Sequence, residues 1–263
     1  MKSQFVRYLA FWLLTCWFFS CGSRSGDRDP RLLVAAAANV QFAMEALETA
    51  FERESGIEIE VIVSSSGKLT AQIRQGAPYD LLISADTLYP GVLYREGYAL
   101  RPPEIYAYGS LVLWSLQDDI ALEGDLLFLG REDIEKIALA NPLNAPYGKE
   151  TIRALESKGL LSKLESKLVY GESIAQTNQY ILSRACQVGF TAKSVVVSPR
   201  VAGVGQWVEV AEELYRPIAQ GVVITRSGEE KYPELSRKFY TFLFGESATQ
   251  IFREFGYDLP SDR

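Results

Sequence analysis

From Leu32 onward, the chain alternates between short apolar runs and segments that carry apolar residues at helical spacing. The run 32–35 is typical of a buried strand. The segment 41–54 follows it and places apolar residues on one helix face, at Ala43, Ala46, Leu47, Ala50 and Phe51. Gly56 ends this helix, and the run 57–63 is predicted to be the next strand.

The same alternation continues to the C-terminus. Further strands are predicted at 80–84, 136–140, 167–170 and 188–191. Further helices are predicted at 67–76, 87–96, 149–158, 174–186, 234–244 and 247–255. Two extended apolar stretches, 105–115 and 215–225, separate these blocks.

Strands that alternate with helices predict an α/β fold with parallel sheets. The two extended stretches suggest two lobes, each a sheet flanked by helices, joined by two crossover strands. In this arrangement the first lobe comprises residues 31–107 and 218–263, and the second comprises residues 108–217. The chain would leave the first lobe once and return to it.

The first thirty residues have a different pattern, typical of an export signal and a tether. Lys2 and Arg7 precede a short apolar run, so residues 1–20 are predicted to be a signal peptide. Cys21 closes this run, and residues 21–30 are polar and rich in small side chains. This resembles the lipobox of bacterial lipoproteins, with Cys21 as the lipidated residue, although Phe18 and Phe19 stand where other residues are usual. A plain cleaved signal or an uncleaved anchor remain alternatives.

Charge and composition exclude several classes of function. The chain of 263 residues has a net charge of −6, and loss of residues 1–20, which hold two basic and no acidic residues, would make it −8. An acidic chain without a dense run of Lys or Arg is a poor candidate for nucleic-acid binding. The sequence contains no histidine, which excludes Ser-His-Asp triads and ordinary zinc sites. Cys186 would be the sole cysteine outside the signal region, so no internal disulfide is expected.

Four turns combine small and hydrogen-bonding residues where a strand leads into a helix. They are 36–39 (Ala-Ala-Ala-Asn), 64–67 (Ser-Ser-Ser-Gly), 145–148 (Ala-Pro-Tyr-Gly) and 171–174 (Gly-Glu-Ser-Ile). A helix N-terminus offers unpaired N–H groups and the positive end of the helix dipole, which suit an anion. The carboxyl edge of an open α/β sheet is also where ligands bind. Each turn alone is more often a simple helix cap, so the interpretation depends on all four meeting at one cleft.

These turns, in this order, resemble the periplasmic molybdate-binding proteins. The first-lobe motifs are Ala36-Ala37-Ala38-Asn39, Ser65-Ser66-Gly67-Lys68-Leu69, Gly76-Ala77-Pro78-Tyr79-Asp80 and Ser84-Ala85-Asp86. The second-lobe motifs are Asn141-Pro142, Ala145-Pro146-Tyr147-Gly148 and Gly171-Glu172-Ser173-Ile174. The similarity runs from about Leu32 to about Gly256.

The resemblance implies a type II periplasmic binding protein that closes on molybdate or tungstate with neutral donors. Ala38 and Asn39 would supply donors at the first helix start, Ser66 a hydroxyl and an N–H at the second, and Tyr147 and Ile174 backbone N–H groups from the second lobe. One branch of the family has Ser in place of Asn39 and a ligand-binding Tyr in place of Ala192. This sequence follows the Ala-Ala-Asn branch instead.

The same resemblance implies how the protein works in the cell. It would be exported to the periplasm or cell envelope, lipid-anchored through Cys21, and would act as a monomer beside an ABC transporter permease. It would have no cofactor, no directly bound metal and no catalytic residue.

Other functions remain open from sequence. The ligand could be sulfate, phosphate or a small carboxylate, with Glu172 or Asp86 as acceptor for a phosphate proton; a carboxylate commonly calls for an Arg clamp, which none of the four turns contains. Ser65 and Lys68 have the Ser-x-x-Lys spacing of penicillin-recognising acyl enzymes, but the companion motifs of that class are absent. A purely structural surface lipoprotein is the third alternative.

Overall fold

The computed structural model describes residues 31–263. The predicted signal peptide, the tether and Cys21 lie outside the described residues. Within residues 31–263, no helix is both long enough and apolar enough to cross a membrane.

The first lobe is built on a five-stranded sheet in the order β2-β1-β3-β10-β4. Its strands are β1 (Leu32–Ala37), β2 (Ile59–Ser64), β3 (Leu81–Ile83), β4 (Glu104–Gly109) and β10 (Ile218–Ile224). β1 pairs in parallel with β2 and β3, whereas β10 runs antiparallel to β3 and β4.

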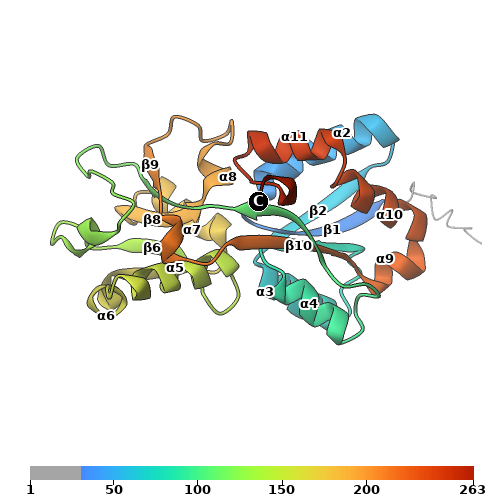
Figure 1. Cartoon of the computed structure of the whole chain (residues 1–263), viewed down its shortest axis with the longest axis horizontal. Coiled ribbons are helices and arrows are strands. Elements are labelled where there is room, and N and C mark those ends of the chain that lie inside the picture. The colour runs from blue at the N-terminus through green and yellow to red at the C-terminus, as the bar shows by residue number, and fades with distance from the viewer. Residues whose placement is uncertain (1–30) are drawn as a thin grey trace, which may run out of the picture. The chain divides into compact units, whose positions relative to one another are not determined.

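Helices cover both faces of this sheet, as Figure 1 shows. They are α2 (Gln41–Ser55), α3 (Ser66–Arg74), α4 (Leu88–Arg95), α9 (Arg226–Lys231), α10 (Pro233–Phe242) and α11 (Glu246–Glu254). Neighbouring residues of β1 face opposite cores, because side chains alternate along a strand. Val34 packs in the core beneath α2, α10 and α11, and Ala35 packs in the core beneath α3 and α4.

The second lobe is built on another five-stranded sheet, in the order β7-β6-β8-β5-β9. Its strands are β5 (Leu111–Ser115), β6 (Ile137–Ala140), β7 (Leu168–Gly171), β8 (Val188–Ala192) and β9 (Gln206–Glu209). Its α-helices are α5 (Pro146–Ser157), α6 (Leu161–Leu164), α7 (Ile174–Leu182) and α8 (Lys193–Val196). Short 3-10 turns lie at η2 (Leu127–Gly130), η3 (Glu165–Lys167) and η4 (Glu212–Leu214), and a last one, η5 (Pro260–Asp262), lies near the C-terminus.

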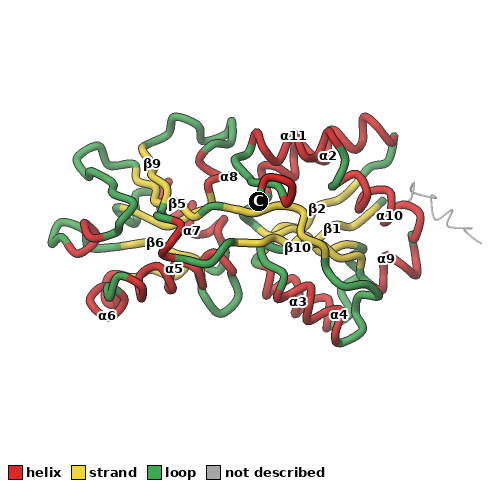
Figure 2. Tube along the Cα trace, viewed as in Figure 1, coloured by secondary structure: helices red, strands yellow, loops and turns green. Residues whose placement is uncertain are grey.

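The chain passes between the lobes twice, as Figure 2 shows. Only Ser110 separates β4 in the first sheet from β5 in the second, and the chain returns from β9 to β10. The predicted boundary after residue 107 falls inside β4, which pairs with β10 as far as Gly109. The predicted return at residue 218 coincides with the start of β10.

The structure corrects several details of the sequence prediction. Both sheets are mixed rather than parallel, because β10 and β5, which follow the crossings, run antiparallel to their neighbours. α5 begins at Pro146 rather than residue 149, since proline suits the first helical turn. α7 ends at Leu182 rather than at residue 186, because the backbone of Arg184 is left-handed (φ 58°) and cannot continue the helix. β9 was not predicted.

Candidate anion-binding site

A small cavity lies where the strand-to-helix turns of the two lobes meet. Its cavity volume is about 10 Å³, roughly the space that one water-sized sphere needs, so only a very small ligand fits. The residues that line the cavity are Ala37, Ala38, Asn39, Ser65, Ser66, Ala85, Ala145, Pro146, Tyr147 and Ile174. These ten include all five residues that the sequence predicts to bind the ligand. The fold therefore brings the four predicted turns together around one space.

The cavity lining is uncharged, and its hydrogen-bond donors come mainly from the backbone. Among the described residues that line the cavity, none has a charged side chain. The backbone N–H groups of Asn39, Ser66, Tyr147 and Ile174 have no hydrogen-bond acceptor within residues 31–263. Three of these residues lie in the first turn of α3, α5 or α7, where N–H groups lack an intrahelical partner. The cavity thus collects unpaired donors from both lobes.

Ser66 offers a hydroxyl as well as an N–H. Its side chain is fully buried, and its Oγ accepts a hydrogen bond from the Ala85 N–H at 3.0 Å. Because the oxygen is the acceptor in this bond, the hydroxyl proton remains free to be donated. The Ala85 contact also fixes the position of the oxygen.

Ala38, which the family resemblance implies is a donor, has no free donor within residues 31–263. Its N–H donates to the Ser64 carbonyl at 2.9 Å, and its methyl side chain has no donor. In this structure Ala38 forms part of the cavity wall, whereas Asn39 keeps an unpaired N–H.

The Asn39 side chain belongs to a buried polar network behind the cavity. Its Nδ2 donates to Gln220 Oε1 at 2.8 Å and to the Tyr257 hydroxyl at 3.2 Å. The Tyr106 hydroxyl donates to the same Gln220 oxygen at 2.9 Å, and Gln220 Nε2 donates to the Tyr147 hydroxyl at 3.3 Å. Gln220, on the returning crossover strand, therefore links cavity residues of both lobes.

The tyrosines of this network remain protonated at neutral pH. Burial raises the pKa of Tyr257 to about 12 and raises the pKa of Tyr106 and of Tyr147 well above the usual value. Their hydroxyls therefore act as neutral hydrogen-bonding groups and place no negative charge beside the cavity.

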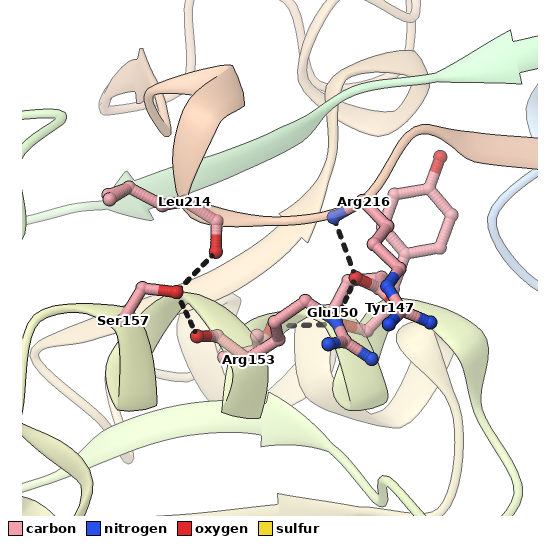
Figure 3. Close-up of polar contacts among 7 residues, drawn as sticks. Tyr147, Glu150, Arg153, Ser157, Leu214 and Arg216 are labelled. Carbon is pink, nitrogen blue, oxygen red and sulfur yellow. Dashed lines mark hydrogen bonds and ion pairs between the residues drawn. The ribbon is translucent and has the colours of Figure 1, made fainter.

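Helix α5, which carries Tyr147, is fastened to the chain segment that returns to the first lobe (Figure 3). The Glu150 carboxylate accepts from the Arg216 N–H at 2.9 Å and from Arg153 Nε at 3.0 Å. Two turns after Glu150, the Ser157 hydroxyl donates to the Leu214 carbonyl at 3.0 Å. These contacts hold the N-terminus of α5, and hence the Tyr147 N–H, in a fixed position.

The two lobes also touch directly beside the cavity. The Gly67 N–H donates to the Asn144 carbonyl at 2.9 Å, and the Tyr89 hydroxyl donates to the Leu143 carbonyl at 3.0 Å. Lys68 forms an ion pair with Glu172 at 2.5 Å, half-exposed and therefore of small energetic value. These contacts join residues on either side of the cleft, so the structure is a closed conformation.

Sequence reasoning missed Gln220, Tyr106, Tyr257 and Asn144. A signal existed for Gln220, because it is an isolated polar residue in the apolar run 218–224. A fully buried polar side chain inside a strand needs partners, and here it has three. The two tyrosines and Asn144 have no such local signal.

Comparison with known proteins places the chain in a family. Residues 32–258 match the family model described as bacterial extracellular solute-binding protein. The chain belongs to this family. The match covers both sheets, both crossings and every residue that lines the cavity.

Named relatives of this solute-binding protein are also similar along most of their length. The molybdate-binding protein ModA of Rhodobacter capsulatus is 34% identical over 227 residues, which are 86% of this chain and 87% of the relative. The solved periplasmic molybdate-binding protein of Azotobacter vinelandii superposes with a TM-score of 0.82 at 32% identity, covering 87% of this chain and 99% of its own. The putative ABC transporter substrate-binding lipoprotein YvgL of Bacillus subtilis is 28% identical, with 97% of each chain covered.

Proposed function

We propose that this solute-binding protein captures molybdate or tungstate in the cavity between its lobes and delivers the ion to an ABC transporter permease. The observation that carries the proposal is the cavity itself, which combines unpaired N–H groups from both lobes with an available hydroxyl and no charged side chain. The molybdate-binding relatives support the same ligand.

The proposed contacts follow from the chemistry of the ion. A deprotonated tetrahedral dianion presents only acceptors, so it needs donors on every side. We assign the N–H groups of Asn39, Ser66, Tyr147 and Ile174 and the Ser66 hydroxyl as donors, with Ala38 as wall. Neutral donors avoid the desolvation cost of burying a Lys or Arg. No catalytic residue and no cofactor are proposed.

The lobe assignment extends this proposal. With the first boundary moved from residue 107 to the end of β4, we place residues 31–109 and 218–263 in the lobe that supplies Asn39 and Ser66, and residues 110–217 in the lobe that supplies Tyr147 and Ile174. Because donors come from both lobes, bound ion would hold the lobes together, and release would require them to separate.

Hydrogenphosphate is the second candidate ligand. Asn39 Oδ1 is buried and has no partner in the described part of the chain, so a ligand that carries a proton could donate to it. Glu172 and Asp86 do not fill that role here, because neither lines the cavity. The acyl-enzyme alternative is not supported, since Ser65 lines the cavity but Lys68 does not.

Thermal unfolding with a panel of anions tests the ligand assignment. A ligand at 1,000 times its Kd adds about 4 kcal/mol to the unfolding free energy, which raises Tm by roughly 8–16 °C for a chain of this size. We expect molybdate and tungstate to give the largest increases among molybdate, tungstate, sulfate and phosphate. A larger increase with phosphate would support the second candidate and contradict the first.

We also propose that the protein is exported and anchored to the membrane by a lipid on Cys21, with residues 21–30 as tether, and acts as a monomer without nucleic acid. The relative named as a lipoprotein supports this arrangement. We expect Cys21→Ser to move the protein from the membrane fraction to the soluble fraction of the cell envelope. If the variant stays in the membrane, the anchor is an uncleaved helix instead.

A further inference from the structure

Ser65 is the residue immediately before α3, yet its side chain does not cap that helix. Its backbone is extended (φ −74°, ψ 149°), as is usual for a capping residue, but no helical N–H donates to its hydroxyl. The side chain is 3% exposed, lines the cavity, and its Oγ has no hydrogen-bond partner within residues 31–263. A buried hydroxyl without a partner lowers stability and so requires an explanation.

The neighbouring serine does not share this lack of a hydrogen-bond partner. Ser66 is equally buried, but its oxygen accepts from the Ala85 N–H. The two hydroxyls therefore differ in one respect: the oxygen of Ser66 is held by the protein, whereas that of Ser65 is held by nothing in the described chain.

We propose that the Ser65 hydroxyl is an additional donor to the bound oxyanion, an inference that rests on the proposed function. The turn 64–67 would then supply three donors: the Ser65 hydroxyl, the Ser66 hydroxyl and the Ser66 N–H. A hydroxyl can rotate its proton towards an acceptor at small cost, which suits an ion with oxygens on all sides. The stability given up by leaving the hydroxyl unpartnered is recovered when the ion binds.

Two substitutions in the same turn separate this role from a structural one. Ser65→Ala removes a hydroxyl without a protein partner, so we expect molybdate affinity to fall by about 10- to 100-fold while the Tm of the ligand-free protein does not fall. Ser66→Ala removes a ligand donor and also orphans the Ala85 N–H. It should therefore lower both the affinity and the ligand-free Tm.

Thr70→Val is the matched control. Thr70 is 4% exposed and its hydroxyl is also unpartnered in the described chain, but it does not line the cavity. Replacement by the isosteric valine should leave molybdate affinity within about twofold of wild type. An equal loss of affinity in Thr70→Val would show that the effect does not come from ligand contact, and would overturn the inference.

The measurements are calorimetric titration with molybdate and thermal unfolding of each ligand-free variant. Unchanged affinity in Ser65→Ala, with weakened binding in Ser66→Ala, would overturn the role of Ser65 and leave the proposed site intact. A lower ligand-free Tm in Ser65→Ala would assign its hydroxyl to the fold and also overturn the inference. Failure of the wild-type protein to bind any tetrahedral oxyanion would overturn the proposed function and, with it, the role of Ser65.

Discussion

Gly67→Ala is expected to weaken molybdate binding by about 5- to 150-fold without destabilising the ligand-free protein. A Cβ at Gly67 would lie 2.9 Å from the Cα and Cβ of Asn144, on the opposite lobe, and 2.8 Å from the Tyr89 hydroxyl. Such overlap in a packed contact costs about 1–3 kcal/mol, which corresponds to that loss of affinity. The clash with Asn144 exists only when the lobes are closed, so its cost falls on ligand binding, whereas the Tyr89 hydroxyl is the end of a flexible side chain of the same lobe and can move aside.

The fold of the first lobe should tolerate this change, because Gly67 lies in α3 and alanine favours a helix. Gly130→Ala is the control: a Cβ there meets nothing within 4 Å, and Gly130 does not line the cavity. Calorimetry and thermal unfolding of both variants make the comparison. Wild-type affinity in Gly67→Ala would mean that binding does not need the closed contact between residue 67 and Asn144.

Gln220→Leu is expected to lower both stability and affinity. Gln220 is fully buried, and its amide makes three hydrogen bonds, with Asn39, Tyr106 and Tyr147. Leucine would remove these bonds and leave buried polar groups with fewer partners, at about 2–4 kcal/mol. For a chain of this size, that lowers Tm by roughly 4–16 °C. Affinity should fall because Asn39 and Tyr147 would lose the group that positions them together.

Gln206→Leu separates positioning from general destabilisation. Gln206, on β9 of the second lobe, donates to the Gln117 and Ile120 carbonyls at 2.7 Å each but does not reach the cavity. We expect it to lower Tm and leave molybdate affinity unchanged. The coupling role of Gln220 is wrong if Gln220→Leu lowers Tm and still binds molybdate as the wild type does.

The sequence predicts much of this site because of how α/β sheets are built. Asn39, Ser66 and Ile174 each lie just after a strand or at a helix start, and such positions gather at the carboxyl edge of the sheet. The local sequence pattern is therefore enough to predict where these turns lie. The resemblance to molybdate-binding proteins selected these residues from turns that would otherwise be read as simple caps.

The features of the site and the fold that the sequence does not predict depend on contacts between distant parts of the chain. Asn39 meets Gln220 and Tyr257, which lie 181 and 218 residues further along, and no local spacing encodes these pairings. The hydrogen bond from the Ala38 N–H to the Ser64 carbonyl depends on the register of β1 against β2. The antiparallel direction of β10 follows from its path back into the first sheet.

Calorimetric titration of the purified wild-type protein with molybdate, tungstate, sulfate and phosphate tests the central claim most directly. A cavity that surrounds one small dianion with neutral donors should bind molybdate and tungstate at one ion per chain, more tightly than it binds sulfate or phosphate. Tighter binding of sulfate or phosphate than of both metal oxyanions, or no binding of any of the four, would contradict it.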